Sequence, residues 1–192
     1  VVGCLDPNPK VAGRGVKMMQ DAGIEVVVGV LENECRTLNK RFFCLHENHR
    51  PYVILKWAQT ADGYIDIERT SGKPITISTP LTKQIVHQQR AENMAIMVGT
   101  RTVLLDNPRL LTTHWRGRNP IRITLDRHGL IPADSKLFSK DAHTIVYREN
   151  TNWQFVLEDL AKKNIHSILV EGGATLLNHI IQSGIYDEVH VE

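Results

Sequence analysis

The chain has 192 residues, of which 42% are hydrophobic and 23% are charged, so it can bury one good core or one domain plus part of a second. Its 23 basic and 21 acidic residues give a net charge of +2 and are mixed along the sequence, which argues against a nucleic-acid-binding surface. Because no apolar run approaches the roughly 18 residues of a membrane span and no signal-peptide pattern opens the chain, we expect a cytoplasmic protein.

The first 45 residues alternate between strand and helix patterns. Residues 1–5 and 24–30 are apolar and predict strands, whereas residues 13–22 and 32–43 have helical spacing. This order is typical of the end of an α/β domain, and because the chain opens within a strand pattern we expect a fragment. The three cysteines lack C-x-x-C spacing, so we expect reduced thiols: Cys4, Cys35 and Cys44.

A polar segment that ends at Pro51 predicts a boundary, with one part over residues 1–46 and a second α/β domain over residues 47–192. In the second part we expect strands at 52–57, 95–99, 121–125, 143–147, 165–170 and from 186 to the last residue. We expect helices at 80–92, 100–105, 155–163 and 174–183, the first of them capped by Ser78 or Thr79.

The most informative segment is an apolar run over residues 167–170 that stops at Glu171, Gly172 and Gly173 and continues with helical spacing. Free backbone N–H groups and the helix dipole favour an anion at such a helix start, and glycine lets a ligand approach the main chain. The same turn also occurs as a simple tight connection. Both interpretations stay open from this segment alone.

Three strand ends carry polar or glycine-rich turns, at residues 60–63, 99–108 and 171–173. In an open α/β sheet, ligands bind beyond the carboxyl ends of the strands. The sequence therefore predicts that the three turns line one cleft.

Ordered motifs cover nearly the whole chain, and together they closely resemble the reductase domain of the bifunctional riboflavin biosynthesis deaminase–reductases, the RibD family. Residues 6–15 resemble a segment from the second half of that family's deaminase domain. The reductase motifs are Leu55-Lys56-x-Ala58-x-Thr60-x-Asp62-Gly63, Arg90-Ala91, Val98-Gly99-x-x-Thr102-Val103-x-x-Asp106-Asn107-Pro108-x-Leu110, Asn119-Pro120-Ile121-Arg122, Val170-Glu171-Gly172-Gly173 and Asp187-Glu188.

The resemblance implies an α/β fold like that of dihydrofolate reductase, with a mostly parallel central sheet flanked by helices, preceded by the C-terminal part of a cytidine deaminase-like α/β domain. It implies a homodimeric enzyme that uses NADPH to reduce the ribose of 5-amino-6-(5-phospho-D-ribosylamino)uracil to a ribityl chain. Positioning of the cofactor against the substrate would supply most of the catalysis.

The family's motifs also carry site roles onto this sequence. The residues implied to touch the cofactor are Ala58, Thr76, Thr102, Asp106, Gly173, Ala174, Thr175 and Leu176. Those implied to touch the substrate are Lys56, Arg90, Leu110 and Glu171, and we expect Asp106, Lys56 and Glu171 to be catalytic.

Several of these residues also permit a simpler interpretation from chemistry alone. Thr102 and Asp106 could cap a short helix, and Arg90 could be a solvated cation at a helix end. Lys56 lies in a strand expected to be buried, where an unpaired ammonium is costly, so a cleft-facing role is favoured. Arg101 could pair with the 2′-phosphate of NADPH or could simply be exposed.

The chain departs from the family at two site positions and lacks its deaminase motifs. Thr76 stands where many members have tryptophan, and Thr113 stands where an arginine is expected, with Arg116 and Arg118 close by. No Pro-Cys motif with a second cysteine downstream exists, so we expect no metal site in this chain and zinc only in the missing part of the deaminase domain.

Two alternatives remain open. The chain could be a non-catalytic nucleotide-binding remnant, which Thr76 and Thr113 permit, or a dihydrofolate reductase-like enzyme with another substrate. Lys56 and Arg90 argue against the second alternative, because a substrate without phosphate has little need of two cations.

Overall fold

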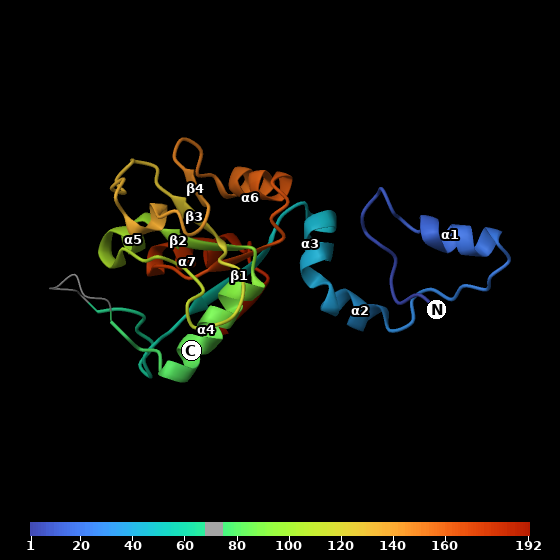
Figure 1. Cartoon of the computed structure of the whole chain (residues 1–192), viewed down its shortest axis with the longest axis horizontal. Coiled ribbons are helices and arrows are strands. Elements are labelled where there is room, and N and C mark those ends of the chain that lie inside the picture. The colour runs from blue at the N-terminus through green and yellow to red at the C-terminus, as the bar shows by residue number, and fades with distance from the viewer. Residues whose placement is uncertain (68–74) are drawn as a thin grey trace.

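A six-stranded parallel sheet forms the centre of the structure, a computed structural model that describes residues 1–67 and 75–192 (Figure 1). Its strands lie in the order β4-β3-β2-β5-β1-β6, and each neighbouring pair is parallel. The parallel sheet was predicted, and three strands match their predicted bounds. The strands are β1 (Tyr52–Trp57), β2 (Ala95–Gly99), β3 (Ile121–Leu125), β4 (Thr144–Tyr147), β5 (Ser167–Val170) and β6 (Glu188–Val191).

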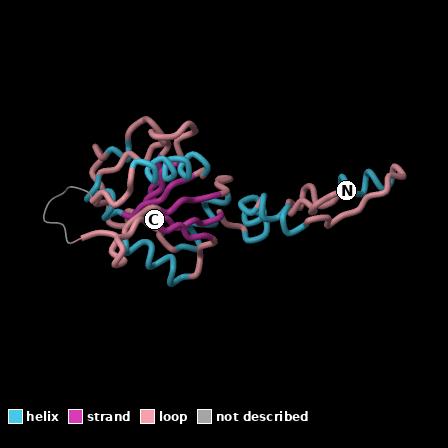
Figure 2. Tube along the Cα trace, turned by 90° about the horizontal axis from the view of Figure 1, so that it is seen from below, coloured by secondary structure: helices cyan, strands magenta, loops and turns pink. Residues whose placement is uncertain are grey.

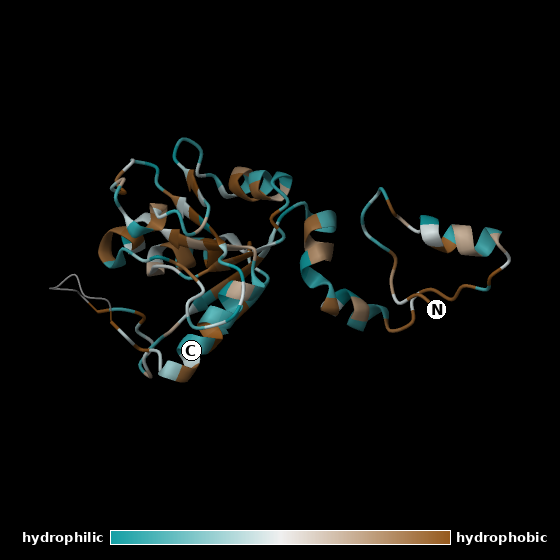
Figure 3. Cartoon of the chain, in the orientation of Figure 1, coloured by the Kyte–Doolittle hydropathy of each residue, from teal (hydrophilic) through white to brown (hydrophobic). Residues whose placement is uncertain are grey.

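The inner strands β2 and β5 are apolar at nearly every position because both faces of the sheet are covered. Along β2, Ala95 and Met97 pack into one core cluster, while Ile96 and Val98 pack into a second cluster on the opposite face. Figure 3 shows these strands as hydrophobic segments inside the body of the protein. Two-sided burial explains why residues 95–98 show no polar alternation.

Helices cover both faces of the sheet (Figure 2). One face packs against α6 (Trp153–Lys162) and α7 (Ala174–Ser183), which contribute Val156, Leu160 and Leu177 to the larger core cluster. Val103 of α5 (Thr100–Asp106) and Leu137 of the short 3-10 helix η1 (Lys136–Phe138) belong to the second cluster. No helix within the described ranges is long and apolar enough to cross a membrane.

The helix α4 (Pro80–Glu92) begins as its sequence predicts. The Thr79 side chain accepts a hydrogen bond from the backbone N–H of Thr82, so Thr79, not Ser78, is the N-cap. Pro80 occupies the first helical position, where its missing N–H is not needed.

The N-terminal segment extends away from the sheet and contains α1 (Arg14–Asp21), α2 (Glu32–Leu38) and α3 (Lys40–Asn48) (Figure 1). The prediction of strands at 1–5 and 24–30 is wrong. The two segments are joined by one isolated bridge between Val2 and Val28. Two short segments without further partners do not make a stable sheet. The single helix predicted at 32–43 is also wrong. It breaks at Asn39, whose side-chain amide donates to the carbonyl of Cys35.

The helix α3 joins this segment to the sheet. Phe43, Cys44 and Leu45 are buried and α3 contacts β1. The start of β1 is fixed to β6, because the Arg50 guanidinium makes two hydrogen bonds of 2.6 and 2.7 Å to the Asp187 carboxylate. The predicted boundary after residue 46 falls within α3 and remains a prediction.

Candidate active site

A cavity of about 940 Å³ opens at the carboxyl ends of four neighbouring strands. The ends of β1, β2, β3 and β5 contribute Ala58, Thr100, Leu125 and Gly172 to its lining. The strand β5 lies between β1 and β2, which are consecutive in sequence, so the cavity is at a point where the strand order changes direction. The predicted turns at 99–108 and 171–173 contribute to the lining, but the same prediction for residues 60–63 is wrong, since none of them lines the cavity. That turn is exposed and closes on itself, with the Thr60 N–H donating to the Tyr64 carbonyl at 2.9 Å.

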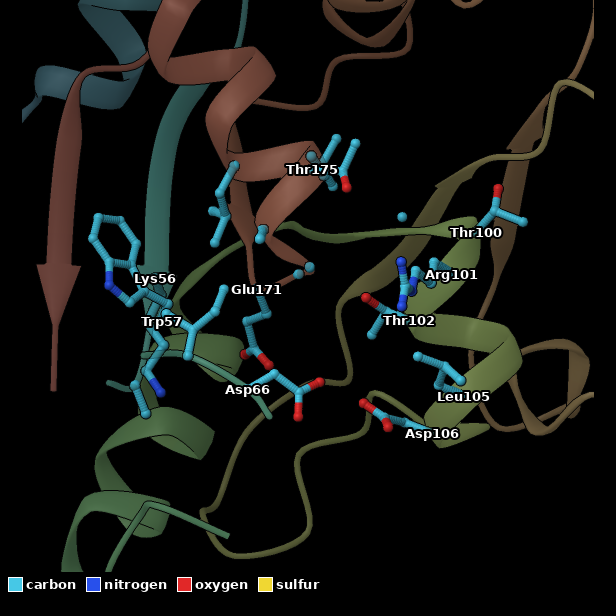
Figure 4. A pocket seen from close by; sticks show the side chains of 18 of the residues that line it. Lys56, Trp57, Asp66, Thr100, Arg101, Thr102, Leu105, Asp106, Glu171 and Thr175 are labelled. Carbon is cyan, nitrogen blue, oxygen red and sulfur yellow. The ribbon is translucent and has the colours of Figure 1, made fainter. Parts of the chain in front are cut away.

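Two walls of the cavity face each other (Figure 4). Lys56 and Trp57 come from β1 on one side, and Thr102 and Asp106 come from α5 on the other. Thr102 and Asp106 share one face of α5 because they are four residues apart. Glu171 lies between the two walls, at the end of β5.

The turn at Gly172 and Gly173 passes close to the opposite wall. A Cβ atom on Gly173 would lie 2.9 Å from the Thr102 Oγ1, and Gly173 has φ 66° and ψ 134°, a backbone conformation that side chains disfavour. A Cβ on Gly172 would lie 3.0 Å from the Val98 side chain. The turn therefore requires glycine most strictly at Gly173 and leaves little room for a side chain at Gly172.

The N-terminus of α7 faces this cavity. Residues 173–176 line it, and no side chain caps the helix N-terminus. Helix N-termini present N–H groups and a positive dipole end, which suit an anionic group such as a phosphate. This cradle, formed by residues 173–176, suits a phosphate of a nucleotide cofactor.

Glu171 is held by Arg90 from the last turn of α4. Arg90 donates from Nε to Oε1 at 2.8 Å and from Nη2 to Oε2 at 2.5 Å, and its Nη1 donates to the Leu111 carbonyl at 3.1 Å. The side chains are only 16% and 10% exposed. Burial would lower the pKa of Arg90, but the Glu171 carboxylate raises it above its usual value, so Arg90 is a permanent cation beside the cavity.

His87 fixes the loop that follows Leu110 against α4. Its Nδ1 accepts a hydrogen bond from the backbone N–H of Thr113 at 3.0 Å, and the His114 ring lies 4.7 Å away, edge to face. Burial, then the charge of Arg90, then His114, lower the pKa of His87 to about 4. His87 is therefore neutral at pH 7 and acts as an acceptor.

The structure gathers most of the predicted site residues around the cavity. All eight expected cofactor contacts line it, as do Lys56 and Glu171. Arg90 and Leu110 are not among the described residues that line it: Arg90 reaches it through Glu171, and Leu110 is 5% exposed within the second core cluster. The assignment of these four to substrate binding, and of Asp106, Lys56 and Glu171 to catalysis, remains a prediction.

Several lining residues were not predicted from the sequence. Arg127 lies two positions beyond the end of β3, and its Nη2 donates to the Thr151 Oγ1 at 2.9 Å. The strand-end rule that identified the other turns could have identified Arg127. Trp153, at the start of α6 with its ring 6.2 Å from that of His179, has no comparable signal in the sequence.

Within residues 1–67 and 75–192, no group of three or more His, Cys, Asp and Glu side chains could hold a metal ion. The three cysteines are free thiols, and Cys44 is buried.

Comparisons with known proteins agree with the fold. The family model described as the RibD C-terminal domain matches residues 51–192. Riboflavin biosynthesis proteins RibD from Actinobacillus pleuropneumoniae and Aquifex aeolicus are 35% and 36% identical over 98% and 100% of the chain. The chain spans 57% and 59% of the length of these two relatives.

Solved structures give the same result. A deaminase and 5-amino-6-(5-phosphoribosylamino)uracil reductase from Thermotoga maritima matches with 36% identity and a TM-score of 0.82, over 95% of this chain and 56% of that chain. Acinetobacter baumannii RibD matches with 30% identity and a TM-score of 0.85, over 100% of this chain and 60% of that chain. The sheet flanked by helices is the dihydrofolate reductase-like fold expected from the motifs. The chain therefore belongs to the RibD C-terminal domain family.

Proposed function

We propose that this chain is the NADPH-dependent reductase of riboflavin biosynthesis that opens the ribose of 5-amino-6-(5-phospho-D-ribosylamino)uracil into a ribityl chain. The observation that carries this proposal is the cavity at the ends of β1, β2, β3 and β5, which every expected cofactor residue lines. Family membership supports the same reaction, since the Thermotoga maritima relative is named for it. Deaminase activity would belong to a longer parent protein, as would its zinc.

NADPH would be held by the α7 N-terminus and the α5 wall. The cradle formed by residues 173–176 would bind the phosphates, while Thr102 and Asp106 on α5 would orient the rest of the cofactor. Bound NADPH supplies the hydride. Thr76, in place of the family tryptophan, lines the cavity and offers a hydroxyl instead of a stacking ring.

Arg101 and Arg127 favour NADPH over NADH. Both side chains are exposed and line the cavity, at the ends of the neighbouring strands β2 and β3. A 2′-phosphate is a dianion that two guanidinium groups recognise well. Thr151 orients Arg127 by accepting hydrogen bonds from Nε and Nη2.

Lys56 and Glu171 would hold the substrate between the two walls. Reduction forms a C–H bond at the first ribose carbon and breaks its bond to the ring oxygen, which takes up a proton. The Lys56 ammonium and the Glu171 carboxylate are charged groups with fixed orientation, because each has an ion-pair partner of its own. Fixed charges of this kind stabilise developing charge without reorganisation.

The test is turnover by the purified 192-residue chain. NADPH and the deaminated pyrimidine substrate should give a loss of nicotinamide absorbance, and mass spectrometry should find a product two hydrogen atoms heavier. Equal turnover of dihydrofolate would favour another substrate class. Binding of NADPH without any single-turnover reduction would favour a non-catalytic nucleotide-binding protein, and analytical ultracentrifugation would test the expected homodimer.

A further inference from the structure

Glu192 occupies a fixed place beside the end of β1. Its backbone N–H donates to the carbonyl of Trp57 at 3.1 Å, and its own carbonyl accepts from the N–H of Gln59 at 2.8 Å. The register of β6 on β1 places Val191 opposite Trp57. The backbone of Glu192 is thus fixed through both its N–H and its carbonyl, so the position of its Cα and Cβ atoms is well defined.

Two groups from different elements meet at one carboxylate oxygen of Glu192. The Lys56 Nζ lies 3.1 Å from Oε2, and the Ser78 Oγ donates to the same oxygen at 3.0 Å. The Lys56 and Glu192 side chains are only 11% and 19% exposed. Burial raises the pKa of Glu192, but hydrogen bonds from Thr82, Lys56 and Ser78 outweigh it and lower that pKa overall, so the carboxylate is charged at neutral pH.

Two partners of Glu192, Lys56 and Ser78, line the cavity, whereas Glu192 is not among the described residues that do so. Lys56 belongs to the β1 wall, and Ser78 ends the stretch from Ile75 to Ser78 that leads into α4. Because the Glu192 carboxylate does not line the cavity, it would affect the reaction indirectly, by holding Lys56 and Ser78 in place.

We propose that Glu192 is a positioning residue of the candidate active site, where its carboxylate holds the Lys56 ammonium on the cavity wall and fixes the 75–78 stretch to the same point. The proposal rests on the proposed function for its catalytic consequence, but the positions of Lys56 and of residues 75–78 can be measured without turnover. Removing the charge leaves a nearly buried ammonium without this partner, which favours another orientation of Lys56.

The test is Glu192→Gln in the 192-residue chain, with Glu188→Gln as the matched control. Glu188 begins β6, which ends one residue before Glu192, and it also pairs with a lysine, Lys40 at 2.5 Å, but it is not among the described cavity-lining residues. An amine-reactive reagent followed by peptide mass spectrometry reports the exposure of Lys56. Hydrogen exchange reports the order of residues 75–78.

In Glu192→Gln we expect several-fold faster labelling of Lys56 and faster exchange over residues 75–78, with both unchanged in Glu188→Gln. We expect kcat to fall about tenfold or more, since a displacement of about 1 Å can cost up to about a hundredfold in rate. The effect on KM for NADPH should be smaller. A purely structural role would lower the melting temperature without changing the labelling of Lys56.

Labelling and exchange equal to wild type in Glu192→Gln would overturn the proposal, whatever the activity. If the wild-type chain shows no reductase activity, the proposed function fails, while these two measurements still decide the role of Glu192. Should Glu192→Gln not fold, Ser78→Ala removes one hydrogen bond to the same oxygen. Faster exchange over residues 75–78 in that variant supports the proposal, and unchanged exchange overturns it.

Discussion

The Arg90 guanidinium binds both carboxylate oxygens of Glu171, at 2.8 Å from Nε and 2.5 Å from Nη2, where β5 reaches the cavity. Two parallel hydrogen bonds fix the plane of the carboxylate as well as its distance. The backbone N–H of Glu171 donates to the Met97 carbonyl at 3.0 Å, so main chain and side chain are both constrained. Glu171 therefore presents one orientation to any ligand in the cavity.

Replacing Arg90 by lysine should keep the positive charge and lose that orientation. An ammonium cannot form the planar pair of hydrogen bonds, so we expect kcat/KM for the pyrimidine substrate to fall by about tenfold to a hundredfold. Steady-state oxidation of NADPH checks this. Arg109→Lys is the control, since the Arg109–Asp141 pair is 55% and 40% exposed and should tolerate the change. Equal kcat/KM in both variants would contradict the positioning of Glu171 by Arg90.

Gly173→Ala should weaken nucleotide binding. The added methyl group would lie 2.9 Å from the Thr102 Oγ1, on a backbone conformation that costs about 1–3 kcal/mol for other residues, so we expect at least about a tenfold higher Kd for NADPH. Fluorescence titration measures this Kd. Gly184→Ala is matched in φ, at 65° against 66°, but has open space around its Cβ position and ends α7 on the far side. Gly184→Ala should lower the stability of the chain and leave the Kd for NADPH unchanged. A higher Kd in both variants would show a general loss of structure.

Arg127→Ala should reduce the preference for NADPH over NADH. Loss of one charge-assisted contact to the 2′-phosphate should raise the Kd for NADPH about tenfold and leave that for NADH nearly unchanged. Arg101→Ala should likewise raise the Kd for NADPH more than the Kd for NADH. Calorimetric titration with both nucleotides gives the four constants. Parallel losses for NADPH and NADH would mean that these arginines bind something other than the 2′-phosphate.

The stability of the chain should decrease between pH 6.5 and pH 4 because of His87. Its pKa is lowered to about 4 in the folded chain, from an ordinary value of 6.5, so the unfolded chain takes up the proton first as the pH falls. The contribution is complete above pH 6.5 and is lost toward pH 4. In His87→Asn, an amide oxygen can accept the Thr113 N–H without titrating. Denaturant midpoints should fall less steeply in that variant, and identical slopes would contradict the assignment, since His166, whose pKa is also lowered by burial, titrates in both.

The sheet was predictable because its signals are local. Residues 95–99 are a short apolar run, residues 121–125 alternate Ile and Leu with Arg122 and Thr124, and the structure gives strands with those same bounds. The N-terminal prediction failed for the opposite reason. Residues 24–30 are as β-branched as a buried strand, but a strand requires hydrogen-bonding neighbours, which the described residues supply only as one bridge at Val28.

The site was predictable where it depends on strand ends and not where it depends on side-chain pairing. Thr102 and Gly173 follow from the rule that ligands bind at the carboxyl edge, and Lys56 follows from the cost of an unpaired ammonium in a buried strand. The pairing of Arg90 with Glu171 joins residues 81 positions apart, and that of Lys56 with Glu192 joins residues 136 positions apart. Such pairs depend on how the elements are arranged in the folded chain. Residue type and local spacing carry no information about that arrangement.

The place of β5 between β1 and β2 has a consequence for synthesis on the ribosome. The strand β5 lies between β1 and β2 and forms hydrogen bonds with both. The strands β1 and β2 therefore have no common partner until residues 167–170 have left the exit tunnel. More than a hundred residues separate β1 from β5, and closure over such a distance is slow. Until then both strands present open edges, which other chains can pair with. We expect chains stalled before residue 167 to depend on chaperones, and chains released after β5 to mature without them.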